Sequence, residues 1–253
     1  MEQGGSRTKE NILKQEPVVS VVCVTFNAAK TLPALIASVA AHKTDEVEFV
    51  VIDGQSTDGT LELLKANNAT IDFWISEPDD GIYSAMNKSI AYTHGQWVIF
   101  LGADDLLANG FNNMIPLLKD PITIYYGNVI FYGKLFAKEY DDYYLTKLNI
   151  CHQGIFYPRS VFNKYQYNLK YKVYADYYLN LQCWKDPEFR FEHADHLVAS
   201  FPEGGFSSYT KDLVFEAERD AIFKKFLKRS SYYRYLNRTL GFWGMLKRFV
   251  QNK

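Results

Sequence analysis

The chain has 253 residues, 47% hydrophobic and 23% charged, a composition typical of a globular protein and not of a disordered or fibrous one. Its 28 basic and 29 acidic residues give a net charge of −1, which argues against a surface built as a whole to hold nucleic acid, so we expect no nucleic-acid partner.

The first half of the chain alternates two kinds of pattern. Residues 1–16 are polar, lack an apolar periodicity and are predicted to form a disordered leader. Apolar, β-branched runs then predict strands over 18–26, 47–52, 71–76 and 96–101, and helical spacing predicts helices over 27–42, 57–64 and 81–93. Strands that are apolar on both faces and alternate with helices indicate an α/β fold with an open, mostly parallel, doubly wound sheet.

The pattern changes after residue 105. Residues 125–138 predict two short strands in a hairpin, residues 174–184 predict a helix, and residues 189–192 and 196–201 predict two further strands. Helices are predicted over 209–229 and 232–250. We therefore expect one domain over residues 17–206 and a helical extension over residues 207–253.

Polar side chains follow each of the four strands predicted in the first half. They are Asn27, Asp53, Asp79, Asp80, Asp104 and Asp105. Because the carboxyl ends of parallel strands meet at one edge of a sheet, where such folds bind ligands, we expect these side chains on one rim. Each is also an ordinary turn or cap residue, but the acidic side chains at three of the four strand ends would repel one another unless cations or hydrogen-bond donors meet them.

The rim favours a nucleotide that is held through a metal ion. Neither GxGxxG nor GxxxxGK[ST] occurs, so no glycine-rich loop of these types grips phosphates. The neighbours Asp104 and Asp105 suit Mg²⁺ or Mn²⁺, which takes one or two protein carboxylates and completes its shell with phosphate oxygens and water. Asp53 can accept a hydrogen bond from a base or a ribose. The expected ligand is therefore a nucleotide with a diphosphate.

Four runs carry a resemblance to a known family. They are VVSVVCVTFN (18–27), VVIDGQSTDGT (50–60), EPDDGIYSAMNKSI (77–90) and IFLGADD (99–105). In order and spacing they resemble the family 2 glycosyltransferases of GT-A fold, and the likeness extends more weakly to about residue 206. It implies a GT-A catalytic domain over 17–206 that transfers a sugar, with inversion, from a nucleotide-diphosphate-sugar donor to a hydroxyl. UDP is the donor nucleotide favoured by family frequency, and the acceptor implied is a polyprenyl-linked glycan of surface polysaccharide synthesis.

The resemblance also gives roles to positions on the donor side. Thr25 and Asn27 would lie along the nucleoside, and Asp53 would accept from the base. Asp104 would contact the ribose or the donor sugar, and Asp105 would be the direct ligand of the Mn²⁺ or Mg²⁺ ion.

Three positions depart from the pattern of the family. Ala103 stands where the first carboxylate of a DxD motif is often found, and Gly54 replaces the second acid of the common DDGSTD run. Lys88 stands where many members have arginine and is the candidate contact to the donor phosphates. These departures leave the expected metal ligand and base in place.

On the acceptor side the resemblance makes Asp176 the general base, which takes the proton of the acceptor hydroxyl. The alternative is that Asp176 only stabilises the N-terminus of the helix over 174–184. His152 and Gln153 are expected to contact the donor diphosphate or the acceptor, although a histidine in such a place is as often structural.

The end of the chain is strongly basic. Residues 221–253 contain nine basic and no acidic residues, interleaved with aromatic and apolar residues at helical intervals. A basic amphipathic helix is typical of an anionic membrane surface; the alternatives are packing on the catalytic domain or a dimer contact.

Cysteine usage and hydropathy indicate where the protein works. Three widely separated cysteines without CxxC spacing fit a reducing compartment. No apolar run approaches the roughly 20 residues that cross a bilayer. We therefore expect a cytoplasmic protein, peripheral on the inner face of the cytoplasmic membrane.

Two other functions fit the same rim. A sugar-phosphate nucleotidyltransferase is also α/β and metal-dependent, but its usual glycine-rich, arginine-containing loop is missing after the first strand. A non-catalytic nucleotide-binding membrane adaptor would keep the acids without using them in catalysis.

Overall fold

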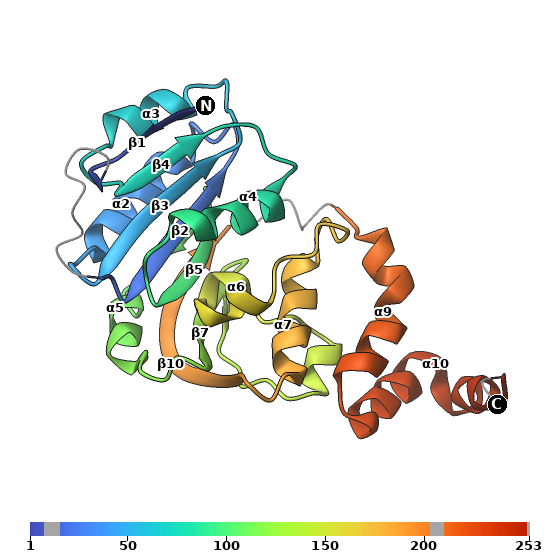
Figure 1. Cartoon of the computed structure of the whole chain (residues 1–253). Helices are drawn as coiled ribbons and strands as arrows, with labels where there is room; N and C mark the ends of the chain where they lie inside the picture. Colours follow the sequence, from blue (N-terminus) through green and yellow to red (C-terminus); the bar gives the residue numbers. More distant parts are fainter. Residues whose placement is uncertain (8–15, 203–209, 252–253) are drawn as a thin grey trace.

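The computed structural model describes residues 1–7, 16–202 and 210–251, with side chains up to residue 241. A central mixed sheet carries helices on both faces, and two further helices follow at the C-terminus (Figure 1). In space the strands run β1-β4-β3-β2-β5-β9-β7-β10-β6, with β8 paired to β7. The strands are β1 (Glu2–Gly4), β2 (Val19–Thr25), β3 (Val47–Asp53), β4 (Phe73–Ser76), β5 (Trp97–Gly102), β6 (Leu106–Leu107), β7 (Thr123–Phe131), β8 (Lys134–Phe136), β9 (Ile155–Pro158) and β10 (Arg190–Phe201).

The predicted parallel sheet is confirmed for β4, β3, β2 and β5, which pair in parallel in that order. All residues of β2 and β3 are buried, because helices cover both faces. Helices α2 (Leu32–His42) and α3 (Thr60–Ala66) pack on one face and α4 (Ile82–Ser89) packs on the other. The first hundred residues are therefore doubly wound, as expected.

The second half of the chain extends the sheet with mixed polarity. Strand β9 lies antiparallel to both β5 and β7, and the hairpin of β7 and β8 confirms the one predicted over 125–138. The two strands predicted over 189–201 are instead one strand, β10, curved in Figure 1 and shifted in register between His193 and Leu197. These irregularities explain why a polar stretch interrupts the apolar pattern. Short helices complete this half: α5 (Phe111–Met114), α6 (Ser160–Lys164) and, in 3₁₀ form, η1 (Ile90–Tyr92), η2 (Ile115–Leu117), η3 (Tyr144–Thr146) and η4 (His152–Gly154).

The N-terminus differs from the prediction of a disordered leader. Residues 2–4 form β1, antiparallel to β4, and Arg7 donates to the carboxylate of Glu48 at 2.8 Å. The prediction is wrong for these residues, because main-chain pairing on an open sheet edge and a buried ion pair need no apolar periodicity. Residues 8–15 lie outside the described part of the chain.

The C-terminal helices pack on the domain. Helix α7 (Ala175–Lys185), helix α9 (Leu213–Phe226) and the start of α10 (Arg229–Gln251) share one apolar cluster, which includes Tyr177, Phe223 and Leu236. Helix α10 is interrupted at Gly241, which has φ 66°. The apolar residues predicted to face a membrane are thus core residues up to Leu236, while Trp243, Leu246 and Phe249 lie beyond the described side chains. Among the described helices none is both long and apolar enough to span a bilayer.

Candidate active site

The carboxyl ends of the parallel strands form one rim, as the sequence predicts. Thr25 at the end of β2 is in register with Asp53 at the end of β3, and Asp53 is in register with Ser76 of β4. Gly102 ends β5 beside Val24, and the turn that carries Asp104 and Asp105 follows it. The last residues of four neighbouring strands therefore lie side by side.

Asp53 is fully buried and holds the loop that follows β3. Its Oδ2 accepts from the backbone N–H of Ser56 at 3.0 Å and from the hydroxyl of Ser76 at 2.6 Å, and its Oδ1 accepts from the hydroxyl of Ser56. Both carboxylate oxygens thus have partners within the protein, and the expected contact to a nucleobase stays a prediction.

Thr25 and Asn27 lie where the first strand passes into its helix. Asn27 has a positive φ of 49° and fastens the same loop, since its Oδ1 accepts from the N–H of Thr57 at 2.9 Å. The hydroxyl of Thr25 is buried and has no hydrogen-bond partner among the described residues. A buried hydroxyl without a partner is unfavourable, so this oxygen marks a place where a polar ligand atom would be stabilised.

Asp105 is buried in the tight turn after β5. The N–H of Gly102 donates to its Oδ2 at 2.6 Å, and a side chain at position 102 would require the two carboxylates to shift, because an added Cβ would lie 2.9 Å from that of Asp104 and 3.3 Å from that of Asp105. Burial raises the pKa of Asp105 to about 7, although hydrogen bonds from Gly102 and Gln153 and the charge of His152 oppose the rise. A nearby cation would favour the ionised form of this carboxylate.

The residues of the turn fit a divalent cation that takes few protein ligands. Within residues 1–7, 16–202 and 210–241 no group of three or more His, Cys, Asp or Glu side chains is placed to hold a metal. Asp105, with Asp104 half-buried beside it, can supply one or two carboxylates, which is the number that Mg²⁺ or Mn²⁺ takes when phosphate oxygens and water fill its other positions. Lys88 is paired with Glu77 at 2.9 Å, so its expected contact to phosphate stays a prediction.

Asp176 lies in the first turn of α7 and is 8% exposed. Four polar groups surround its carboxylate. Its Oδ1 accepts from the N–H of Tyr177 at 2.7 Å and lies 3.1 Å from the hydroxyl of Tyr83, whose single proton has a nearer acceptor, the carbonyl of Val173, at 2.6 Å. Its Oδ2 accepts from Nδ2 of Asn149 at 2.9 Å and lies 3.3 Å from Nδ1 of His152. The carboxylate is therefore held in one orientation, as a positioned base must be.

His152 interacts with Asp176 and is influenced by the charge of Asp105. Burial lowers its pKa, but the hydrogen bond and charge of Asp176, together with the charge of Asp105, outweigh burial and raise it. The side chain of Gln153 acts on Asp105 as well, lowering its pKa. The structure thus brings the neighbours His152 and Gln153 into one region with Asp105 and Asp176, which come from two other segments of the sequence.

Several partners of the acids were missed by the sequence reasoning. Tyr83 and Asn149 contact Asp176, and Ser56 and Ser76 bind Asp53. Asn149 lies three residues before His152, and Tyr83 lies inside one of the runs that resemble the family. Their nearness in the sequence to these candidate residues is the feature that could have identified them. Neutral polar side chains do not stand out by charge or spacing, and for that reason they were not singled out.

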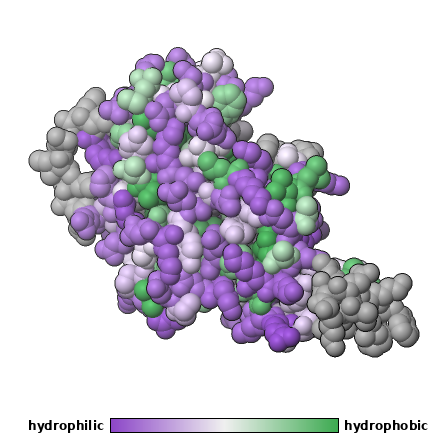
Figure 2. All heavy atoms as spheres, turned by 45° about the vertical axis from the view of Figure 1, so that its right-hand side comes forward, coloured by the Kyte–Doolittle hydropathy of each residue, from purple (hydrophilic) through white to green (hydrophobic). Residues whose placement is uncertain are grey.

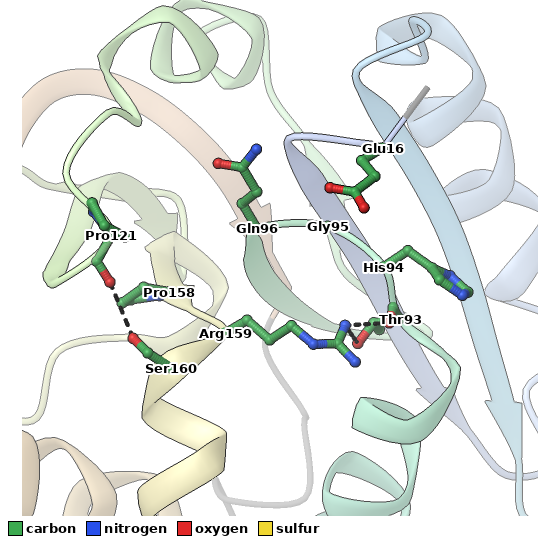
Figure 3. Close-up of a pocket in the computed structure, with 9 residues that line it drawn as sticks. All are labelled: Glu16, Thr93, His94, Gly95, Gln96, Pro121, Pro158, Arg159 and Ser160. Carbon is green, nitrogen blue, oxygen red and sulfur yellow. Dashed lines mark hydrogen bonds between the residues drawn. The ribbon is translucent and has the colours of Figure 1, made fainter. Parts of the chain in front are cut away.

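A cavity of about 480 Å³ lies away from this rim, at the opposite end of β5 (Figure 3). Two of its polar side chains are engaged by the protein itself: Figure 3 shows the guanidinium of Arg159 reaching Thr93, and the hydroxyl of Ser160 donates to the carbonyl of Pro121 at 3.0 Å. The cavity contains none of the acids of the rim, so we place the candidate active site at the rim and not here.

Comparison with known proteins agrees with this arrangement. The profile described as "Glycosyl transferase family 2" matches residues 20–141. A protein of Mycobacterium tuberculosis named "PGL/p-HBAD biosynthesis glycosyltransferase" is 36% identical over 225 residues, with 84% of each chain covered. An Escherichia coli protein named "UDP-Glc:alpha-D-GlcNAc-diphosphoundecaprenol beta-1,3-glucosyltransferase WfgD" is 29% identical over 180 residues, 67% of this chain and 70% of that one.

A solved structure shows the same fold. The crystal structure of S. aureus TarS 1-349 in complex with UDP-GlcNAc has a TM-score of 0.68 at 17% identity, covering 88% of this chain and 73% of that one. This chain spans 44% of a longer TarS chain. With the fold, the rim and the 36% identical relative in agreement, the chain belongs to glycosyltransferase family 2 and has the GT-A fold.

Proposed function

We propose that the protein transfers a sugar, with inversion, from a UDP-sugar to a hydroxyl of a polyprenyl-diphosphate-linked glycan in surface polysaccharide synthesis. One observation carries the proposal: Asp105 on the donor rim and Asp176 both lie near His152, which is 3.3 Å from Oδ2 of Asp176 and whose pKa is raised by the charges of both acids. Inverting displacement requires these two functions, a stabilised leaving group and a base for the incoming hydroxyl.

Each acid has a part in this reaction. Asp105, with Asp104, would hold a Mn²⁺ or Mg²⁺ ion, whose Lewis acidity stabilises the charge of the leaving diphosphate. Asp176 takes the proton of the acceptor hydroxyl as its oxygen bonds to the anomeric carbon. The bond between that carbon and the donor phosphate oxygen breaks on the opposite face, which gives inversion.

The choice of donor and acceptor rests on the donor site and on the relatives. The hydroxyl of Thr25, which has no partner among the described residues, and the loop held by Asp53 favour a nucleoside at the end of β2. A UDP donor is supported by the name of WfgD and by the UDP-GlcNAc of the TarS complex. A lipid-linked acceptor is supported by the diphosphoundecaprenol in the name of WfgD.

A transfer assay tests this function. The protein is incubated with UDP-, GDP- or dTDP-sugars and a polyprenyl-diphosphate-linked acceptor, with Mn²⁺ or with EDTA. We expect nucleoside diphosphate and an elongated lipid from a UDP-sugar, and loss of both with EDTA. Release of nucleoside diphosphate from none of the donors would contradict the proposal. Pyrophosphate from a nucleoside triphosphate and a sugar 1-phosphate would instead identify a nucleotidyltransferase, and metal-dependent UDP binding without turnover would identify an adaptor.

We also propose that the protein works at an anionic membrane surface in the cytoplasm. Three exposed cations surround two tyrosines where η3 meets α10: Arg234 stacks on Tyr143 at 3.8 Å, Lys147 lies 4.5 Å from the same ring, and Lys138 lies 5.4 Å from Tyr144. Hydrophilic residues dominate the face shown in Figure 2. Basic groups near a surface with aromatic neighbours are attracted to anionic headgroups, and a lipid-linked acceptor is found there.

Vesicle flotation tests the membrane contact. We expect the protein to float with vesicles that contain anionic lipid and not with neutral ones, and the double variant Lys147→Glu/Arg234→Glu to lose flotation. The matched control is Lys119→Glu/Lys185→Glu, which changes the net charge equally at exposed positions elsewhere. Equal loss in both variants would point to net charge alone and contradict a defined membrane-binding surface.

A further inference from the structure

A line of hydrogen bonds runs through the core and ends on Asp176. The hydroxyl of Tyr157 on β9 donates to Oδ1 of Asn180 at 2.7 Å. Nδ2 of Asn180 donates to Oδ1 of Asn149 at 2.8 Å, and Nδ2 of Asn149 donates to Oδ2 of Asp176 at 2.9 Å. Three donors in succession therefore point towards the carboxylate. Asp176 and Asn180 lie one turn apart on α7, so both reach Asn149 from the same face of that helix.

Burial fixes the direction of this line. Tyr157 and Asn180 are both fully buried, and buried polar groups are nearly always hydrogen-bonded. A reversed amide at Asn149 would turn its oxygen towards the carboxylate of Asp176 and its NH₂ towards the NH₂ of Asn180, which would break two bonds. A reversed amide at Asn180 would turn its oxygen towards Oδ1 of Asn149 and the carbonyl of Ile150, two acceptors to which its Nδ2 now donates at 2.8 and 3.3 Å. Each member is thus held in one orientation by its neighbour.

The line reaches the base from the side of the sheet. The first turn of a helix is held loosely by its own main chain, because its first N–H groups lack partners within the helix. Hydrogen bonds that share a direction polarise one another and strengthen the last bond of the series. The bond from Asn149 therefore depends on Asn180 and, through it, on Tyr157.

We propose that Tyr157, Asn180 and Asn149 form a positioning relay that holds the carboxylate of Asp176 in the orientation that receives the acceptor proton. The inference rests on the proposed role of Asp176 as base. None of the three is a catalytic residue, since they act through Asp176.

Kinetics of single variants test the relay. We expect Tyr157→Phe, which removes one oxygen, to lower kcat roughly 3- to 10-fold, and Asn149→Ala to lower it more, about 10- to 100-fold, both below the loss of the base itself. Donor KM and UDP affinity should stay unchanged, because none of the hydrogen bonds of the three side chains goes to Thr25, Asp53 or Asp105. Unchanged kcat in Tyr157→Phe would overturn the proposal, as would a rise in donor KM that accounts for the whole effect.

Two controls separate positioning from stability and from the proposed function. Tyr235→Phe removes another buried tyrosine hydroxyl, which donates to Asp220 at 2.9 Å in the C-terminal helices, and should lower the melting temperature without lowering kcat at 25 °C. In an Asp176→Glu background, where the carboxylate is displaced from the relay, Tyr157→Phe should have little further effect on kcat. If Tyr157→Phe lowered kcat as much in the Asp176→Glu background as in the wild-type protein, the proposed relay would be refuted. Absence of transfer by the wild-type protein would instead refute the proposed function.

Discussion

The proposed donor half and the proposed base half of the site hold their acids in different ways. On the donor side Asp53 is bonded by Ser56 and Asp105 by Gly102, both three residues away along the chain. On the proposed base side Asp176 accepts from Asn149, which is 27 residues away, and lies 3.1 Å from the hydroxyl of Tyr83, which is 93 residues away. The donor half is thus built mostly from local turns, whereas the base is positioned by tertiary packing. Changes in the base half should therefore alter turnover, and changes in the donor half should alter donor binding.

The largest expected effect comes from removing the base. Asp176→Asn keeps the shape of the side chain but cannot accept the proton, so kcat should fall by about 10²- to 10⁴-fold. Binding of UDP, measured by calorimetry, should stay within about twofold of wild type. Asp186→Asn, at the other end of α7, serves as the control and should keep wild-type kcat. A variant at Asp176 that retains full turnover would remove the distinction between the two halves.

The next largest effect is the dependence of metal affinity on pH in the donor half. Burial raises the pKa of Asp105 to about 7, and a metal ion must displace the proton held below that pH. The affinity for Mn²⁺ with UDP should therefore fall by about tenfold for each pH unit below 7 and level off above it. In the metal-free protein, folding stability depends on pH in the opposite direction from metal affinity. Since the folded state keeps this proton longer than the unfolded chain, the contribution of Asp105 to stability is full near pH 3 and is lost as the pH rises through about 7.

Titration calorimetry between pH 5.5 and 8 checks the metal affinity, and thermal melting in EDTA checks the stability. Asp105→Asn should abolish the metal-dependent stabilisation by UDP and flatten the melting profile over the same range. A wild-type affinity for Mn²⁺ that does not change between pH 5.5 and 7 would contradict the assignment of Asp105.

The sequence predicts the donor half of the site better than the base half. The strand ends, the alternation of strands and helices and the rim acids lie within short runs, so periodicity and motif order were sufficient for them. The line from Tyr157 to Asn149 was not predictable, because its members are neutral and meet only when β9 packs against α7. The single curved β10 and the strand β1 were also missed, since bulges and edge pairing leave little apolar pattern.

A smaller effect is expected from the serine that supports Asp53. Ser76→Ala removes a donor to a fully buried carboxylate, so the free energy of unfolding should fall by about 1–3 kcal/mol. Donor KM should rise while kcat stays near wild type. Urea denaturation and initial rates measure the two, with Ser160→Ala, whose hydroxyl bonds a carbonyl at the far end of the sheet, as the control. A fall in kcat with unchanged KM would place Ser76 with the base half.

The smallest expected effect is a change in the pKa of His152, which interacts with Asp176 and is influenced by the charge of Asp105. The charge and hydrogen bond of Asp176 raise the pKa of His152 against its burial, so Asp176→Asn should lower that pKa. Asp105 should keep a smaller influence in the variant. NMR titration of the imidazole carbon signals measures the change, and a pKa that stays the same or rises would show that His152 is not coupled to the base.

The pairing of the first residues has a practical consequence for truncated forms of the enzyme. A protein shortened to begin at residue 17, where motif comparison alone would place the catalytic domain, would lose β1 and Arg7 together. The outer side of β4 would then present bare main-chain donors and acceptors to other molecules, and Glu48 would keep its charge in the interior without its guanidinium. Such a fragment is expected to self-associate, so expression of the enzyme should retain these seven residues.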